Sequence, residues 1–570
     1  MIRNSRSVNA SVACRFAAAL LSVVVFASCT DTAKPLPDSV RSDALGGTLV
    51  IALPRDAKWL YPPKVDQTLD FAIIGSIYDK LADIGDALNT TGDAGFEHRL
   101  AESWKWASDS LSIGFKIRAD AKFHDGVPVR AEDVRFTFRA YTDTRGQTVN
   151  ESYLSNIDSV SIPDSLTAVF WFKRRTPQQF FDATYQMFIL PSHLLADIPI
   201  EELGTDSVTA NPVGSGRFRY SGRVPQQSIE MISDTGNYRK RAKVDRVVWA
   251  VNANVQGAAL SVFSGDADFF EKLQPDDLDK VPKNPDLKIV PYMQAGYSYL
   301  GFNLRSPQDH TKPNPLFSDV RVRRALTMAV DRVASARSVL DTFARPAIGP
   351  APRMMFPNPD SLTQIPFDVV HARALLDTAG WILEPGKDVR TKNGVPLAFE
   401  IVMPNTSRPR IAYADLLVQQ FRGVGAAATS RAIEGQVWYQ MMLDHKFDAT
   451  LGAWNVTPGM RGLPQTWGSR GMTGQNYQTY SRAAFDADVD AALGSMVPAT
   501  AGRLWNRAFQ QIIDDAPSIF LYEERAIGLM QKRVNPARMR ADAWYSDLAD
   551  WTIDANKRLP RDRQSPGAAR

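Results

Sequence analysis

The clearest alternation of hydrophobic and polar positions lies at residues 111–117, which read LSIGFKI. Apolar residues stand at every second position there, and this pattern predicts a β-strand with one buried and one polar face. A tight turn is expected at residues 124–126, which read HDG. From about Ala131 the apolar residues follow the period of a helix and share one face, so an amphipathic helix is expected to begin there.

Strand-like and helix-like patterns recur along the rest of the chain. Strands are expected at residues 49–53, 160–171 with a bend at Pro163, 246–251, 297–304, 397–403, 447–454 and 519–522. Helices are expected at residues 71–81, 180–195 with a break at Pro191, 256–263, 317–332, 368–381, 411–421 and 504–515. Ser318 is the expected N-cap of the helix at 317–332, and Gly380 is the expected stop of the helix at 368–381.

Length and composition narrow the class of protein. The 570 residues suggest roughly three to four units of about 150 residues, or one large discontinuous fold. A hydrophobic fraction of 44% and a charged fraction of 22% are ordinary for a soluble globular protein. The formal charge of +4 is too small to indicate nucleic-acid binding. Residues 557–570 are expected to form a basic, disordered tail.

The N-terminus has the pattern of a targeting segment. Three arginines precede an apolar run at residues 16–26, which is too short to span a bilayer. The run ends in the letters FASC, which resemble a bacterial lipobox, although Phe26 stands where leucine or valine is usual. This resemblance implies that a signal peptide, residues 1–28, is removed and that Cys29 is lipidated. Thr30 does not mark retention at the inner membrane, and an ordinary signal peptide with an incidental cysteine is the alternative.

The cysteine count agrees with this interpretation. The chain has two cysteines, Cys14 within the expected signal peptide and Cys29 at the expected new N-terminus. Neither an intrachain disulfide nor a site with several thiolate ligands is therefore expected. Residues 29–45 are mostly polar and contain proline, so they are expected to form a tether between the lipid anchor and the fold.

Several motifs in a fixed order resemble one protein family. Residues 99–138 contain LAESW, FKIR, KFHDG and AEDVRF, which are similar to the signature segment of the family-5 extracellular solute-binding proteins of peptide-type ABC transporters. In that family a serine or threonine often precedes the helix, whereas Arg130 stands here. Further similar motifs begin at residues 46, 77, 211, 297, 317, 368, 476 and 515, so the resemblance extends over about residues 46–555.

The resemblance implies an α/β fold of the two-lobed periplasmic-binding type (class II-like and large), with a hinge between the lobes. Lobe I is expected at residues 46–302, with an inserted subdomain at about 80–205. Lobe II is expected at 303–525, and residues 526–556 are expected to return to lobe I. The implied function is capture of a peptide or peptide-like solute between the lobes and its delivery to a membrane permease with ATPase subunits. The protein is expected to be a lipid-anchored monomer of the periplasm or cell envelope.

Aromatic residues of the C-terminal half are the candidate ligand contacts, because aromatic faces suit ligands of mixed polarity. The candidate site residues are Trp454, Asn455, Trp438, Glu434, Tyr477, Trp467, Tyr299 and Tyr297. The alternative for each aromatic residue is ordinary packing in the core or at the surface.

One departure from the family concerns the ligand. Peptide receptors of this family typically carry an aspartate shortly after the tryptophan that corresponds to Trp454, and it pairs with the peptide's ammonium. Residues 455–459 read NVTPG and contain no carboxylate. A buried ammonium without a counter-charge costs several kcal/mol, on the order of a lost ion pair. Either another acid such as Glu434 or Asp268 takes the role, or the ligand lacks a free amino terminus, as in blocked or cyclic peptides, sugars or chelates.

The sequence gives little support for catalysis or for a cofactor. The six histidines lack the spacing of zinc ligands, and the chain has no Gly-x-Ser-x-Gly nucleophile motif. The glycine-rich residues 211–220 are not followed by the lysine of a phosphate-binding loop. His445 is the one histidine near the candidate site, so a bound nickel chelate stays open. A carboxylate pair cannot be located from sequence, so a cell-envelope hydrolase is the alternative from a different class, and an oligosaccharide receptor is the alternative within this one.

Overall fold

The computed structural model describes residues 45–148, 151–205, 210–356 and 359–563. They belong to one compact unit, which spans Asp43–Arg570. The expected signal peptide, Cys29 and the tether up to residue 44 lie outside the described residues. Across the described ranges, no helix is long and apolar enough to cross a bilayer.

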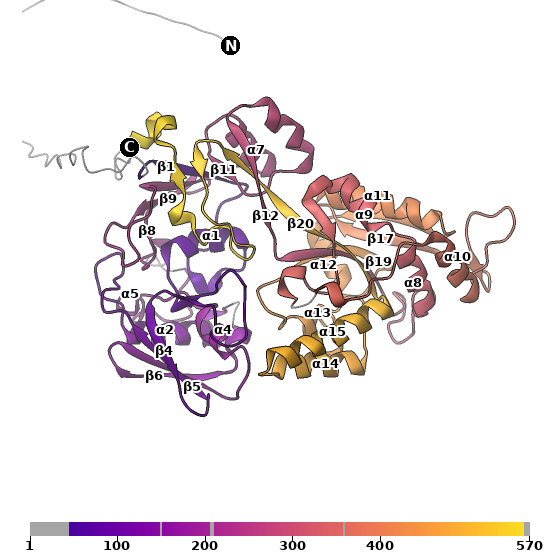
Figure 1. Cartoon of the computed structure of the whole chain (residues 1–570), viewed down its shortest axis with the longest axis horizontal. Helices are drawn as coiled ribbons and strands as arrows, with labels where there is room; N and C mark the ends of the chain where they lie inside the picture. Colours follow the sequence, from indigo (N-terminus) through magenta and orange to yellow (C-terminus); the bar gives the residue numbers. More distant parts are fainter. Residues whose placement is uncertain (1–44, 149–150, 206–209, 357–358, 564–570) are drawn as a thin grey trace, which may run out of the picture. The chain divides into compact units, whose positions relative to one another are not determined.

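A 12-stranded sheet runs through the fold, and Figure 1 shows its strands on both sides of β20. In spatial order its main path is β18 (Ala427–Ile433), β17 (Ala398–Pro404), β19 (Ala449–Asn455), β13 (Gly296–Phe302), β20 (Ser518–Gln531), β11 (Phe269–Phe270), β1 (Thr48–Leu53), β10 (Arg246–Val251), β9 (Ser228–Ser233) and β8 (Phe218–Val224). Two further strands, β12 (Leu287–Met293) and β14 (Ala344–Pro346), also pair with β20.

The strand β20 belongs to both halves of this sheet. Its first residues pair with β13, and its last residues pair with β12 and β11. Separate apolar cores cover the two halves, one around Trp249 and Phe269 and the other around Phe302 and Phe399. The fold is thus α/β with two lobes. The expected boundary after residue 525 falls inside β20, and the residue ranges of the lobes stay a prediction.

A second sheet, with four strands, carries the alternating segment of the sequence. Its antiparallel strands are β4 (Ala101–Trp106), β5 (Ser112–Ile117), β7 (Thr167–Phe172) and β6 (Ile157–Asp164). The helix expected from Ala131 is confirmed as α2 (Ala131–Thr142). Arg130 lacks a capping hydroxyl, but its backbone N–H donates to the Asp133 carboxylate at 2.7 Å, which satisfies one of the free donors at the helix start.

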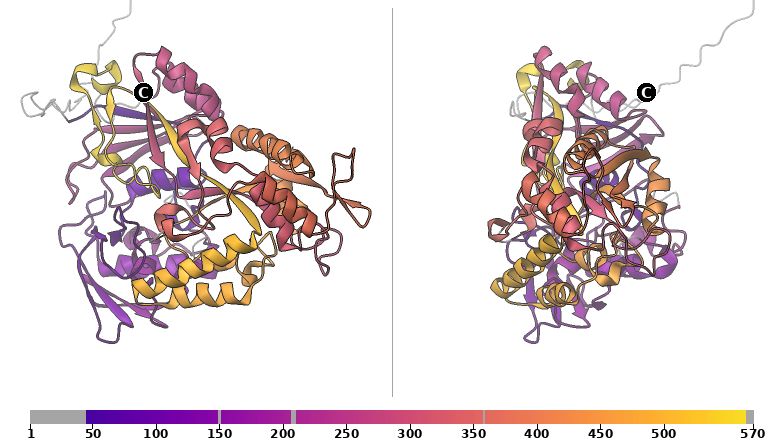
Figure 2. Two further views of the ribbon diagram at one scale, coloured as in Figure 1. Left: turned by 45° about the vertical axis from the view of Figure 1, so that its right-hand side comes forward. Right: turned by 90° about the vertical axis from the view of Figure 1, so that its right-hand side faces the viewer.

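The remaining described elements are short or flank the large sheet. The helices are α1 (Thr68–Ile77), α3 (Glu151–Leu154), α4 (Gln179–Thr184), α5 (Ser192–Leu195), α7 (Val255–Phe263), α8 (Val320–Met328), α9 (Arg332–Leu340), α10 (Val369–Thr378), α11 (Arg408–Arg422), α12 (Gly435–Leu443), α13 (Leu463–Thr466), α14 (Ala483–Gly494) and α15 (Pro498–Asp515). The short strand pairs are β2 (Ala82–Asp83) with β3 (Glu97–His98), β15 (Thr391–Lys392) with β16 (Val395–Pro396), and β21 (Val534–Asn535) with β22 (Thr552–Ile553). Figure 2 shows α14 and α15 packed side by side.

Two expected helices are divided in the structure. The expected helix at 180–195 consists of α4 and α5 with extended chain between them, because the Ile189 N–H bonds to the Asp79 carbonyl and the Leu190 N–H bonds to the Thr137 hydroxyl. The expected helix at 317–332 begins only at α8, and α9 follows it. The Asp319 carboxylate caps α8 in place of Ser318, since it accepts the Arg321 N–H at 2.9 Å.

Part of the expected disordered tail has a defined structure, so the prediction is wrong for residues 557–563. Residues 557–563 are ordered, because the buried carboxylate of Asp562 accepts the Thr48 N–H at 2.8 Å and pairs with Arg533 at 2.7 Å. This contact ties the end of the described chain to β1. Residues 564–570 lie outside the described part of the chain.

Candidate functional site

The pairing of β13 with β19 brings the central aromatic residues together. The strands are antiparallel, with Tyr297 opposite Trp454 and Tyr299 opposite Gly452. Residues opposite each other on paired strands project on the same face, so the three rings share one side of the sheet. A Cβ at Gly452 would lie 2.9 Å from the Tyr299 hydroxyl, and glycine therefore leaves room for that ring.

Trp454 lies within a stack of aromatic rings. Its ring is nearly parallel to Tyr299, with centroids 6.3 Å apart at 10°, and to Tyr477, with centroids 5.6 Å apart at 20°. Trp438 meets Tyr477 edge-on at 6.2 Å. Trp467 meets Tyr299 edge-on at 5.5 Å. The structure thus brings residues from β13, β19, α12 and the chain near α13 into one cluster.

Burial divides the predicted site residues into two groups. Four side chains are buried: Tyr297, Tyr299, Trp467 and Tyr477. Trp454 and Trp438 are half-buried, whereas Asn455 and Glu434 are exposed. The Trp467 indole N–H donates to the Tyr297 hydroxyl at 2.8 Å, so this buried pair is satisfied internally. The Trp454 indole nitrogen is buried and finds no acceptor among the described residues.

Positive charge lies beside this cluster. Burial raises the pKa of Tyr299, and the nearby guanidinium of Arg410 opposes that rise. Arg410 acts in the same direction on the pKa of Tyr522, which burial raises to about 12. The Nε of Arg410 is buried and has no hydrogen-bond acceptor among the described residues. The sequence reasoning missed Arg410, because its position on α11 gives no sign of its proximity to β13.

The two candidate acids for the role of the family's aspartate, Asp268 and Glu434, are already engaged. Asp268 is fully buried and pairs with Arg533 at 2.6 Å and with Arg561 at 2.8 Å. The Glu434 carboxylate caps α12, since it accepts the N–H groups of Gln436 at 2.8 Å and Val437 at 3.0 Å. These hydrogen bonds lower the pKa of Glu434. Asp268 is therefore closed to a ligand, and Glu434 is exposed but serves the helix end.

The chain after Trp454 contacts residues of the expected inserted subdomain. The Arg461 guanidinium lies 2.7 Å from the Asp182 carboxylate, and its Nε donates to the Gln178 side chain at 2.5 Å. A third donor reaches the Tyr153 carbonyl at 3.2 Å. Asp182 is 1% exposed, and burial raises its pKa to about 6 although Arg461 opposes the rise. One segment thus joins the aromatic cluster to the region of the four-stranded sheet.

Gly459 lets this segment pass close to its neighbours. Its φ of +100° belongs to a region that favours glycine. A Cβ there would lie 3.2 Å from the Thr90 hydroxyl, which leaves little space for a side chain. These contacts were not predicted, because Arg461 and Asp182 are 279 positions apart in the sequence.

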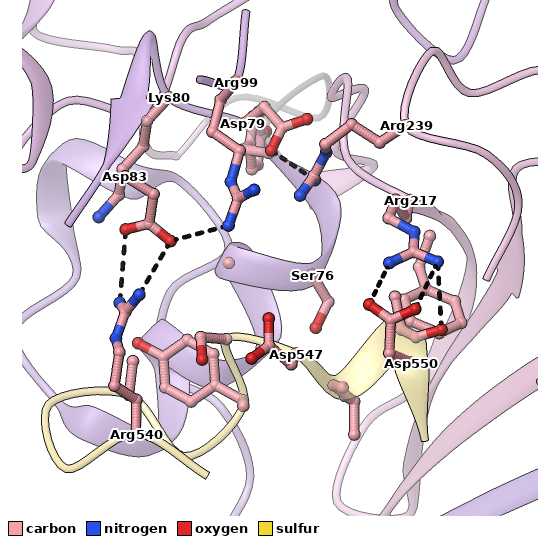
Figure 3. Close-up of a pocket in the computed structure, with 18 of the residues that line it drawn as sticks. Ser76, Asp79, Lys80, Asp83, Arg99, Arg217, Arg239, Arg540, Asp547 and Asp550 are labelled. Atoms are coloured by element: carbon pink, nitrogen blue, oxygen red, sulfur yellow. Dashed lines mark hydrogen bonds and ion pairs between the residues drawn. The ribbon is translucent and has the colours of Figure 1, made fainter. Parts of the chain in front are cut away.

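A separate charged cavity of about 660 Å³ lies within lobe I (Figure 3). The end of α1, residues 217–243 and residues 540–550 line it. Its ion pairs are Arg99–Asp83 at 3.3 Å, Arg540–Asp83 at 3.3 Å, Arg239–Asp79 at 2.6 Å and Arg217–Asp550 at 2.6 Å. Burial lowers the pKa of Lys80 to about 8. Carboxylates of the wall thus hold the arginines, and the ion pairs join Arg540 to Asp83 of β2 and Asp550 to Arg217. No spacing in the sequence indicated these contacts.

The described residues contain no group of three or more histidine, cysteine, aspartate or glutamate side chains that could hold a metal ion. Both ring nitrogens of His445 face carbonyl oxygens, which can only accept: Nδ1 lies 3.1 Å from the Tyr477 carbonyl and Nε2 lies 2.9 Å from the Met472 carbonyl. Both ring nitrogens of His445, the histidine expected nearest to the candidate site, are therefore engaged.

The fold is that of the two-lobed solute-binding proteins. The oligopeptide-binding protein AppA from Bacillus subtilis, solved in complex with a nonapeptide, matches 90% of this chain and 99% of its own with a TM-score of 0.72 and 23% identity. CtaP from Listeria monocytogenes, an ABC transporter substrate-binding protein, matches 90% of this chain and 100% of its own with a TM-score of 0.78 and 20% identity. The model of the bacterial extracellular solute-binding proteins, family 5, matches residues 95–474, and the chain belongs to that family.

Sequence relatives within the family have different ligands in their names. Oligopeptide-binding protein AppA of Bacillus subtilis is 26% identical over 433 residues, which cover 74% of this chain and 77% of AppA. Heme-binding protein A of Haemophilus influenzae is 24% identical over 452 residues, which cover 75% of this chain and 79% of that protein. Family membership therefore shows that the chain is a solute-binding protein. The identity of the ligand depends on the residues of its binding site.

Proposed function

We propose that this protein captures a peptide or peptide-like solute between its two lobes and delivers it, unchanged, to an ABC transporter permease with ATPase subunits. The observation that carries the proposal is the segment from Trp454 to Arg461. It begins in the aromatic cluster of lobe II and ends on Asp182 and Gln178 of the inserted subdomain. A solute enclosed there is shielded from water, which strengthens its polar contacts. AppA, whose name and complex are those of a peptide binder, supports the choice of ligand.

The predicted site residues have two roles in this proposal. Trp454, Trp438, Asn455 and Glu434, which are half-buried or exposed, contact the solute. Tyr297, Tyr299, Trp467 and Tyr477 are buried beneath them and hold the Trp454 ring in place. The proposed lobes are residues 46–302 and 303–525, with a return segment at 526–556. Closure of the lobes around the solute is favoured because the closed form binds it better.

The proposed location is the periplasm or cell envelope, with a lipid on Cys29 after removal of residues 1–28. Cells grown with labelled palmitate test this. The label is expected in the wild type and in Cys14→Ser, and it is expected to be absent from Cys29→Ser. Label retained by Cys29→Ser would contradict a lipid on that residue.

Native mass spectrometry of the full chain, purified in detergent from the envelope of its own host, tests the proposed ligand. We expect a co-purifying mass that fragments as amino acids. Trp454→Ala is expected to lose that mass, whereas Trp171→Ala, which removes an exposed tryptophan of β7, keeps it. A co-purifying mass that fragments as a sugar or a chelate would show that the solute is not a peptide. A chain that arrives empty and cleaves added peptides would contradict the binding role and favour the hydrolase.

A further inference from the structure

A second cavity lies where the expected inserted subdomain meets lobe II. Its volume is about 510 Å³, and it is bordered by Arg174 and Arg175 on one side and by Arg461, Gln465 and Arg470 on the other. One acidic residue, Asp490, is part of its wall. The cavity therefore begins beside the contact between Arg461 and Asp182, at the far end of the segment that starts at Trp454.

The cations of this cavity are unequally neutralised. Arg461 is paired with Asp182 and Arg470 with Asp490. Arg174 and Arg175 are exposed, and their guanidinium groups form no ion pair with any of the described residues. Two cations that line the same cavity without a counter-charge repel each other, and an anion bound in that cavity reduces the repulsion. Arginine is also the side chain whose planar donors best match a carboxylate.

Around the aromatic cluster, too, positive charge is less completely neutralised than negative charge. Residues 455–459 supply no carboxylate, Asp268 is buried in an ion pair, and Glu434 caps a helix. Arg410 adds a guanidinium whose Nε has no acceptor among the residues described. The acids Asp268, Glu434 and Asp490 are thus engaged, whereas Arg174 and Arg175 have no ion-pair partner among the described residues. Such a site repels an ammonium and attracts an anion.

We propose that the cavity at Arg174 and Arg175 binds an anionic group, a carboxylate, of the captured solute, and that the preferred solute has no free amino-terminal ammonium. This inference rests on the proposed peptide-binding function and specifies its substrate class: acidic peptides or peptide-like molecules with a blocked or absent amino group. Trp454 takes the apolar part of the solute, and the arginines take its charge.

Titration calorimetry with the full chain and three pools of synthetic tetrapeptides tests the proposal. The first pool is N-acetylated with a free terminal carboxylate, the second is N-acetylated with a terminal carboxamide, and the third has a free ammonium and a carboxylate. The variants are Arg174→Gln/Arg175→Gln and, as a matched control, Arg337→Gln/Arg422→Gln. The control removes two exposed arginines of α9 and α11 that form no ion pair among the described residues.

We expect the acetylated carboxylate pool to bind the wild type at least about tenfold more tightly than the carboxamide pool, as expected for a charge-assisted contact. The Arg174→Gln/Arg175→Gln variant is expected to bind these two pools within about twofold of each other, and the control variant to behave as the wild type. Circular dichroism and the melting temperature show whether each variant is folded.

Three results overturn the inference in distinguishable ways. Equal binding of the carboxylate and carboxamide pools, or a preference that survives in Arg174→Gln/Arg175→Gln, removes the anion site and leaves peptide capture intact. Tighter binding of the free-ammonium pool than of the acetylated pool removes the proposed exclusion of ammonium. Failure of a folded wild type to bind any pool removes peptide capture itself, and the inference with it.

Discussion

Two buried arginine–aspartate contacts of this molecule differ in what they are suited to do. Arg533 is 6% exposed and lies between two fully buried carboxylates, Asp268 at 2.6 Å and Asp562 at 2.7 Å. Arg461 is 31% exposed and has one carboxylate, that of Asp182, which is 1% exposed. The first arginine joins β1, the start of β11 and the end of the described chain, whereas the second joins two regions that the proposed hinge motion would separate.

The difference follows from how completely each charge is compensated. Arg533 has two carboxylates and the Thr48 carbonyl as acceptors, so opening that cluster leaves several buried charges without partners. Asp182 has a single cation, and burial outweighs it, so its pKa rises to about 6. An ion pair whose carboxylate is already close to protonation is weak, and it forms and breaks reversibly. The Arg533 cluster is therefore suited to stability, and the Arg461 contact is suited to the proposed closure.

The largest expected effect is on stability. Arg533→Met leaves the buried Asp562 without a cation and Asp268 with Arg561 alone, and it should lower the free energy of unfolding by about 3–5 kcal/mol. Urea denaturation followed by circular dichroism measures this. A loss below about 1 kcal/mol would show that the Arg533 cluster is no more important than a surface ion pair.

The next effect is a pH dependence that depends on Asp182. Its pKa is about 6 in the fold and about 3.9 in an unfolded chain, so the folded protein binds the proton more tightly. Between these values the stability that this group contributes falls as pH rises, by up to about 3 kcal/mol. Asp182→Asn removes the titration.

Denaturation curves of both proteins between pH 4 and pH 7 measure this effect. The stability of Asp182→Asn relative to the wild type is expected to increase as the pH rises through this range. Carboxylates elsewhere in the fold affect both proteins alike and cancel in the difference. A constant difference, or one that shrinks as pH rises, would show that Asp182 is not a buried acid with a raised pKa.

The smallest effect is on closure. Arg461→Gln removes the cation that reaches Asp182 and Gln178, so the open form should become more populated and the solute should bind about tenfold more weakly. In small-angle scattering without solute, Arg461→Gln should have a larger radius of gyration than the wild type. Arg507→Gln is the matched control, since Arg507 pairs with Asp488 between α14 and α15 of the same lobe. Equal changes in both variants would contradict a role of Arg461 in closure.

Local periodicity predicted much of the fold. The alternation at residues 111–117 became β5, the spacing after Ala131 became α2, and residues 246–251 form β10 as expected. Prediction was wrong where tertiary hydrogen bonds replaced local ones. Residues 185–191 are apolar enough for a helix, but the backbone N–H groups of Ile189 and Leu190 bond to Asp79 and Thr137 instead.

The candidate site was predicted only in part. Motif order pointed to Trp454 and its aromatic neighbours, and the structure places them in one cluster. The contact between Arg461 and Asp182 and the unpaired Arg174 and Arg175 were missed. Both features depend on segments that are far apart in the sequence. No spacing of residues in these segments shows which other segment each one meets in the fold.

Hydrogen–deuterium exchange of the full chain, with and without the solute that co-purifies with it, tests capture between the lobes most directly. Bound solute should protect amides both in residues 456–463 of lobe II and in residues 174–182 of the expected inserted subdomain. Amides of residues 540–550, which line the charged cavity within lobe I, should exchange as before. Protection confined to one lobe, or centred on residues 540–550, would contradict the account.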